Sequence, residues 1–170
     1  MSELITCILC GASSFRVIHK RDEWKYLRCL KCGLISLYPR PDTESLFKSY
    51  DDYLPAISEE IDRWKIMMKP VIKKSAELIE LHGRTGKGRV LDIGCGYGFF
   101  LNEMKNRGWD VEGIEISPAG RKYAQENLNL HVHANPLEDK LFPENAFDVV
   151  TLFYVIEHVG NPLEIIANVK

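Results

Sequence analysis

The stretch that decides the fold is RVLDIGCGYGFFL, residues 89–101. Residues 89–93 place apolar side chains around Asp92, which is typical of a buried parallel strand. Glycines then occupy positions 94, 96 and 98, and a helical pattern runs from Phe99 to Arg107, closed by Gly108. A strand, a glycine turn and a helix present free backbone N–H groups at the helix amino terminus, a general device for holding an anionic or nucleotide-like ligand.

Further strands and helices follow this unit. WDVEGIEIS predicts a strand that ends in Glu115, and Pro118 to Asn127 predicts a helix capped by Ser117. LNLHVHAN and AFDVVTLFYVIEH predict a third and a fourth strand, and Asn161 is expected to cap a last helix. This alternation predicts an α/β fold: a partial Rossmann-like parallel sheet of about four strands with right-handed crossovers.

The spacing of the glycines argues against two other nucleotide sites. A dinucleotide fingerprint requires a glycine at position 99, where the chain has phenylalanine. GRTGKGR lacks the serine or threonine of a phosphate-binding loop, and no predicted strand precedes it. Glu115 follows Gly98 by 17 residues, at a strand end where an acid commonly accepts hydrogen bonds from ribose hydroxyls.

The amino-terminal region carries a separate cysteine motif. CILCG and CLKCG form C-x2-C-x18-C-x2-C, the spacing of a tetrahedral zinc site, with ligands Cys7, Cys10, Cys29 and Cys32. Four cysteine ligands close the site, so the zinc would be structural. Disulfides are the alternative, which a reducing compartment disfavours.

Between the two cysteine pairs, FRVIHKRDEWKYLRC predicts a strand, a turn and a strand, the body of a zinc ribbon. A basic cluster in and beside this hairpin is either a solvated face or a site for a phosphorylated or nucleic-acid partner: Lys20, Arg21, Lys25, Arg28 and Lys31.

We divide the chain into a zinc ribbon (1–38), a connector with helices (39–87) and a partial α/β domain (88–170). The connector predicts a short helix at 42–50 and an amphipathic helix from Ser58, whose Pro70 indicates a kink or two helices end to end. The apolar stripe of this helix predicts core packing or a lid over a ligand.

Composition restricts the partners and the location. With 45% hydrophobic and 27% charged residues among 170, the chain is in the ordinary globular range. A net charge of -2 gives no global attraction to nucleic acid or anionic lipid, so a nucleic-acid substrate is disfavoured. Without a signal peptide or an apolar run near the roughly 20 residues that span a bilayer, a cytoplasmic protein is expected.

Taken in order, these motifs resemble those of the class I S-adenosylmethionine-dependent methyltransferases. VLDIGCGYG is similar to their first motif and GIEIS to the acidic second motif, while NPLEDKLFPENAFDVV resembles the loop and strand that frame adenine. EHVGNP resembles the turn after the fourth strand. The zinc ribbon and YPRPD resemble the amino-terminal module of a bacterial subgroup often linked to glycan or secondary-metabolite modification.

The resemblance implies a cofactor site. The methionine part would contact Asp92 and residues 94–98 and the ribose Glu115, while the adenine edge would contact residues 136–138. Pro136 departs from the family pattern, so the amide of Leu137 would hold adenine. The implied set is Asp92, Gly94, Cys95, Gly96, Tyr97, Gly98, Glu115, Ile116, Pro136, Leu137, Glu138 and Phe153.

Two residues of that set have alternative roles. Tyr97 either closes over the methionine carboxylate or packs in the core. Cys95, between two glycines, is interpreted as a small residue tolerated by the turn and not as a nucleophile.

Glu157 and His158 are the candidate catalytic residues, because they follow the fourth strand at its carboxyl end. His158 is the candidate general base. The alternatives are that the pair stabilises the turn before Pro162 or shares a metal. His131 and His133 share one face of the third strand and are interpreted as packing or edge residues.

The leading hypothesis is a methyltransferase for a small-molecule or sugar-like acceptor. A non-catalytic zinc-ribbon binding protein with a nucleotide-sensing α/β half is the alternative. Family members continue beyond the fourth strand, so a truncated chain with an exposed sheet edge that favours association is expected.

Overall fold

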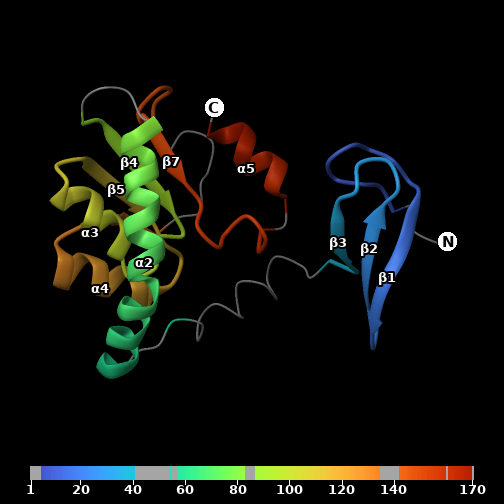
Figure 1. Cartoon of the computed structure of the whole chain (residues 1–170), viewed down its shortest axis with the longest axis horizontal. Helices are drawn as coiled ribbons and strands as arrows, with labels where there is room; N and C mark the ends of the chain where they lie inside the picture. The colour runs from blue at the N-terminus through green and yellow to red at the C-terminus, as the bar shows by residue number, and fades with distance from the viewer. Residues whose placement is uncertain are drawn as a thin grey trace.

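The computed structural model describes residues 5–40, 54, 57–82, 87–134, 142–159 and 161–169. Within them the chain forms two sheets (Figure 1), an antiparallel one in the order β1-β2-β3 and a parallel one in the order β6-β5-β4-β7. The parallel sheet confirms the predicted α/β fold class.

The antiparallel sheet is the predicted hairpin with one further strand. β1 (Phe15–Arg21) and β2 (Trp24–Cys29) are joined by a tight turn in which Asp22 has a φ of 55°. β3 (Ile35–Tyr38) then pairs with β2. The sequence did not predict β3, because ISLY is only four residues long and ends at the boundary between the ribbon and the connector.

The parallel sheet consists of β4 (Arg89–Ile93), β5 (Asp110–Ile114), β6 (His131–His133) and β7 (Val149–Thr151). The fourth strand is much shorter than the apolar run suggests. The chain leaves the sheet after Thr151 and turns, with Tyr154 in the left-handed region at a φ of 57°. The apolar residues after Thr151 therefore belong to a loop at the carboxyl end of the sheet.

The three helices after the glycine turn begin where their caps predict. α3 (Phe99–Asn106) follows Gly98, and α4 (Pro118–Leu128) is capped by Ser117, whose side chain accepts from the Gly120 amide at 3.4 Å. α5 (Pro162–Asn168) is capped by Asn161 through the Glu164 amide at 3.4 Å.

The connector contributes one long helix, α2 (Ser58–His82), which is continuous through Pro70. Of the two alternatives for Pro70, two helices end to end is therefore wrong. The short helix expected at 42–50 lies outside the described residues.

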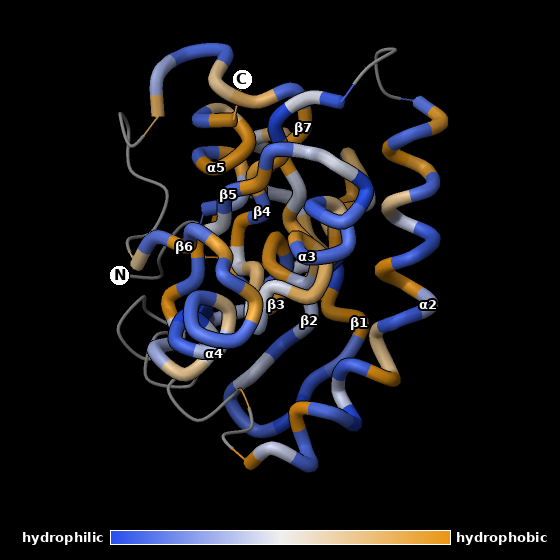
Figure 2. Tube along the Cα trace, turned by 90° about the vertical axis from the view of Figure 1, so that its left-hand side faces the viewer, coloured by the Kyte–Doolittle hydropathy of each residue, from blue (hydrophilic) through white to orange (hydrophobic). Residues whose placement is uncertain are grey.

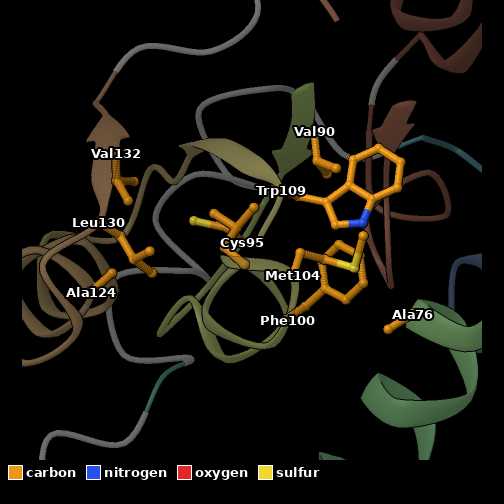
Figure 3. Packing of buried hydrophobic residues seen from close by; sticks show 10 residues of the cluster. Ala76, Val90, Cys95, Phe100, Met104, Trp109, Ala124, Leu130 and Val132 are labelled. Atoms are coloured by element: carbon orange, nitrogen blue, oxygen red, sulfur yellow. The ribbon is translucent and has the colours of Figure 1, made fainter. Parts of the chain in front are cut away.

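The core lies between the parallel sheet and the layer formed by α2, α3 and α4. Phe100, Met104 and Trp109 pack together near Ala76 of α2, while Leu130 lies toward α4 (Figure 3). On the opposite face, where α5 lies in Figure 1, Leu91, Ile93 and Ile114 form a smaller cluster. Figure 2 shows hydrophilic and hydrophobic residues alternating along α2, as expected for a helix with one face on the core.

None of the helices in the described part of the chain is both long enough and apolar enough to cross a bilayer.

Candidate functional site

A cavity of about 950 Å³ opens at the carboxyl ends of β4, β5 and β7. This is the edge of an open α/β sheet at which ligands usually bind. Nine of the candidate cofactor-binding and catalytic residues line it: Asp92, Gly94, Cys95, Gly96, Tyr97, Glu115, Ile116, Phe153 and His158. The tertiary structure thus brings the glycine turn, the end of β5 and the loop after β7 to one cavity.

The glycine turn is tied to the neighbouring strand. The amides of Gly94 and Cys95 both donate to the Ile114 carbonyl, at 2.7 and 3.0 Å. Gly98 has a φ of 77°, and a Cβ there would lie 2.5 Å from Leu130 Cδ1. A side chain at position 98 would therefore clash with Leu130, and Gly98 does not line the cavity.

Glu115 connects the end of β5 to the glycine turn. One carboxylate oxygen accepts from the Gly96 amide and the other from the Ser117 amide, both at 2.7 Å. The residue is only 7% exposed. Because a carboxylate can accept about four hydrogen bonds, two backbone donors leave capacity for ligand hydroxyls.

Asp92 is the second buried carboxylate beside the cavity. Thr151 Oγ1 donates to its Oδ1 at 2.7 Å. Burial raises the pKa of the Asp92 carboxyl to about 7, although the Thr151 hydrogen bond opposes the rise, and the negative charge of Glu115 adds to it. A cationic ligand group bound beside Asp92 would therefore favour the ionised carboxylate, whose negative charge would in turn stabilise the ligand.

Tyr97 and Cys95 are both buried. The Tyr97 ring packs against Phe99 and Tyr123, with centroids 5.7 and 5.3 Å apart, and burial raises the pKa of its hydroxyl to about 12. Burial also raises the pKa of the Cys95 thiol well above its usual value. A neutral thiol is a poor nucleophile, in agreement with the interpretation of Cys95 as a small turn residue.

The sequence did not assign α2 to the cavity, although the structure does. Its apolar stripe contributes a wall that includes Trp64, Met68, Val71 and Ile72. Ile72 also packs against the core. The amphipathic pattern left core packing and a lid as alternatives, and the helix combines core contacts with a wall of the cavity.

The candidate catalytic residues lie in the loop after β7. Both side chains are exposed, and of the two only His158 lines the cavity. The His158 amide donates to the Val155 carbonyl at 2.9 Å, which closes the turn. Arg40, which follows β3 at the start of the connector, donates to the Val159 carbonyl at 3.2 Å. The candidate adenine residues 136–138 lie outside the described residues.

The four amino-terminal cysteines converge, with all four sulfurs within 4.8 Å of one another. Cys7 Sγ lies 3.6 Å from Cys32 Sγ, and Cys10 Sγ lies 3.6 Å from Cys29 Sγ. Sulfurs bound to one tetrahedral zinc would be roughly 3.8 Å apart, so the cluster is compatible with a metal site. A hydrogen bond from the Cys32 backbone amide lowers the pKa of the Cys29 thiol to about 6 against the opposing effect of burial. Although the Leu34 amide opposes the rise, burial and the hydrogen bonds to the other three sulfurs raise the pKa of the Cys32 thiol to about 12, so a cation that neutralised the shared negative charge would stabilise the cluster.

Comparison with known proteins places this chain among methyltransferases. The family model described as "Methyltransferase domain" matches residues 64–170. A ubiquinone biosynthesis O-methyltransferase from Actinobacillus pleuropneumoniae serotype 5b is 36% identical over 99 residues, covering 52% of this chain and 42% of that protein. The same enzyme from Acinetobacter baumannii (strain AYE) is 42% identical over 92 residues, covering 49% of this chain and 38% of that protein. The chain thus spans about two fifths of the length of these relatives.

Two solved structures share the fold. An amino pentose methyltransferase from Micromonospora echinaspora, with S-adenosylmethionine bound, matches with 27% identity and a TM-score of 0.50, covering 59% of this chain and 44% of that one. The magnesium protoporphyrin IX methyltransferase of Synechocystis PCC 6803 matches with 18% identity and a TM-score of 0.57, covering 77% and 72%. The family match and the strand order of this chain's parallel sheet together show that the chain belongs to the methyltransferase domain family, with the class I Rossmann-like fold.

Proposed function

We propose that the cavity at the carboxyl ends of β4, β5 and β7 binds S-adenosylmethionine and that the protein transfers its methyl group to a small-molecule acceptor. The observation that carries the proposal is the contact between Glu115 and the Gly96 amide, because it joins an acidic strand end to a glycine turn at a ligand-sized cavity. Membership of the methyltransferase domain family supports the same function.

We assign the parts of the cofactor to different walls of the cavity. The methionine end would lie against Asp92 and residues 94–97, where the acid offers a negative charge to its ammonium group. Glu115 and Ile116 would hold the ribose, and Phe153, which also lines the cavity, would contact the cofactor there. Leu137 and its neighbours Pro136 and Glu138 remain the proposed adenine contacts. Gly98 would act indirectly, by allowing the glycine turn to pack on Leu130.

When bound, the cofactor supplies a methyl group that its sulfonium already activates, so the protein mainly has to align the acceptor and exclude water. His158 lines the cavity and would take a proton from the acceptor when that acceptor is protonated. Glu157 does not line the cavity and would instead orient the loop. His158→Asn should therefore lower kcat and leave product binding unchanged, which a rate assay and a binding titration separate.

We place the acceptor against the wall of the cavity formed by α2, which is apolar where Trp64, Met68 and Val71 line it. The named relatives act in ubiquinone biosynthesis and on an amino pentose. We therefore propose that the methylated atom is an oxygen of a small-molecule acceptor. For the acceptor itself, a sugar-like molecule is the second candidate. An acceptor screen that returned only N-methylated products would contradict this assignment.

We further propose that Cys7, Cys10, Cys29 and Cys32 hold a structural zinc ion and that residues 1–38 form a zinc ribbon, followed by a connector at 39–87 and the methyltransferase domain at 88–170. The ribbon would support or present the acceptor. Arg40, in the connector directly after the ribbon, donates a hydrogen bond to Val159, next to His158. This contact supports the role, because it ties the chain just after the ribbon to the loop that carries His158.

The test is calorimetric titration of the zinc-replete chain with S-adenosylhomocysteine, the demethylated product. We expect one equivalent to bind and Glu115→Gln to weaken binding at least tenfold, about 1.4 kcal/mol. Glu126→Gln is the matched control, because Glu126 is exposed on α4 away from the cavity, and it should bind as the unaltered chain does.

Absence of binding to a chain whose parallel sheet is protected from hydrogen exchange would contradict the proposed cofactor site. Binding without turnover of any acceptor in a screen would favour the alternative of a nucleotide-sensing binding protein.

A further inference from the structure

A second group of possible metal ligands lies at the edge of the parallel sheet, apart from the cysteine cluster. Glu112 on β5 stands opposite His131 on β6 in the parallel register. His133, two residues further along β6, has its side chain on the same face as His131 because side chains alternate along a strand. The three residues therefore project from one face of two neighbouring strands.

The ligand atoms of these side chains converge. Glu112 Oε2 lies 2.9 Å from His133 Nε2 and 3.6 Å from His131 Nδ1, and all three ligand atoms are within 4.8 Å of one another. Ligand atoms held about 2.0–2.2 Å from one tetrahedral metal ion would be roughly 3.3–3.6 Å apart. Small side-chain rotations would bring the three atoms to that spacing.

Arg89 orients the carboxylate. Its guanidinium donates to Glu112 Oε1, which leaves Oε2 facing the two imidazoles, and it also donates to Asp110 Oδ2 at 3.0 Å. The positive charge of Arg89 is thus shared with a second acid. One positive and two negative side chains give the group a net formal charge of -1 with neutral histidines, which favours a cation.

The exposure of the three residues suits an open site. The Glu112 and His133 side chains are 16% and 24% exposed, while His131 is 72% exposed. Two imidazoles and a carboxylate are ligands that zinc accepts, and sites with three protein ligands keep a position for water or another ligand. An ion could enter from solvent and complete its coordination with water.

We propose that Glu112, His131 and His133 bind one zinc ion, or a similar divalent transition metal, in an open site that fastens the short edge strand β6 to β5. The inference is independent of the proposed methyl transfer. The alternative is a simple hydrogen bond between Glu112 and His133. That hydrogen bond requires no contribution from the exposed His131, so His131 separates the two explanations.

The experiment uses the full chain loaded with one equivalent of zinc, verified by elemental analysis. Calorimetric titration with further Zn²⁺ should reveal a second equivalent with micromolar affinity. His131→Ala should weaken this second binding at least tenfold without loss of fold, because the side chain is largely exposed. Binding should also slow hydrogen exchange in β6, since a ligand that binds only the folded strand pair stabilises it.

His82→Ala is the matched control, because His82 is an exposed histidine at the end of α2, and it should leave the second equivalent unchanged. Glu112→Gln gives an independent check, since a neutral amide is a much poorer metal ligand. The proposal is overturned if the loaded chain takes up no second equivalent, or if His131→Ala binds it as tightly as the unaltered chain.

Discussion

The amino-terminal module (residues 1–38) and the α/β half of the chain (residues 88–170) are stabilised in different ways. In the described part of the module, the buried hydrophobic residues are Cys7, Leu27 and Cys29, while Val17 and Ile35 are exposed. The α/β half contains a cluster of ten buried residues, to which α2 also contributes. We therefore expect a module with so little apolar burial to depend on its sulfur cluster, whereas the α/β half is held by packing.

The glycines of the two regions show the same contrast. Gly11 and Gly33 have φ values of 70° and 80° in the turns after the cysteine pairs, and a Cβ there would meet nothing within 4 Å. Gly94 and Gly98 have similar φ values, but a Cβ would meet Val155 at 2.3 Å and Leu130 at 2.5 Å. Backbone conformation alone requires glycine in the module, while close packing also requires it in the α/β half.

Metal removal should have the largest effect and separate the two regions. We expect chelation, or Cys29→Ser, to abolish protection from hydrogen exchange in β1, β2 and β3, because structural zinc contributes on the order of 10–16 kcal/mol in comparable peptides. The strands β4, β5 and β7 should keep their protection. Hydrogen exchange read by mass spectrometry resolves the two regions in one sample.

Exchange protection in β1–β3 that survived chelation would contradict a metal-dependent module. Restoring zinc to the chelated chain, but not to Cys29→Ser, should recover the protection.

Truncating a core side chain of the α/β half should instead destabilise that half and leave the amino-terminal strands β1, β2 and β3 protected. Met104 is fully buried beside Phe100 and Trp109 (Figure 3), so Met104→Ala should lower the free energy of unfolding of the α/β half by about 2–5 kcal/mol. Met67 is 60% exposed, and Met67→Ala, the matched control, should change stability by no more than about 0.5 kcal/mol. Urea denaturation followed by exchange in β4 and β5 measures both. Equal effects of the two substitutions would show that the α/β core is not packed as described.

The smallest effect concerns the buried acid of the α/β half. Because the folded pKa of Asp92 is raised to about 7, the folded chain binds a proton that the unfolded chain releases near pH 4. This group therefore lowers stability as the pH rises from about 4 to about 7. Asp92→Asn removes the charge and keeps an oxygen that can accept from Thr151.

Relative to the unaltered chain, Asp92→Asn should gain about 1–2 kcal/mol of stability at pH 5 and roughly 3–4 kcal/mol at pH 8. Asp62→Asn, at an exposed aspartate on α2, should gain nothing across the same range. Urea denaturation at the two pH values gives the comparison, and a gain shared by both variants would refute the buried-acid explanation.

Local patterns were sufficient to predict much of the fold. The run ending in Ile93 and the caps Ser117 and Asn161 each predicted an element that the structure contains, and the C-x2-C pairs predicted four sulfurs that converge. Each prediction succeeded because its signal is contained within a few neighbouring residues. The fourth strand was overestimated, because apolar residues that line a cavity or a loop have the same composition as residues inside a strand.

By itself, the sequence determined the order of strands and helices in the α/β half, the cysteine motif and the acid at the end of β5, since these depend on propensity, capping and spacing. The tertiary structure decided that α2 forms a wall of the cavity, that Glu115 binds the Gly96 and Ser117 amides, and that His158 lines the cavity. It also brought Glu112 to the two histidines of β6. These contacts join residues far apart in the chain, and only strand register and helix packing bring them together.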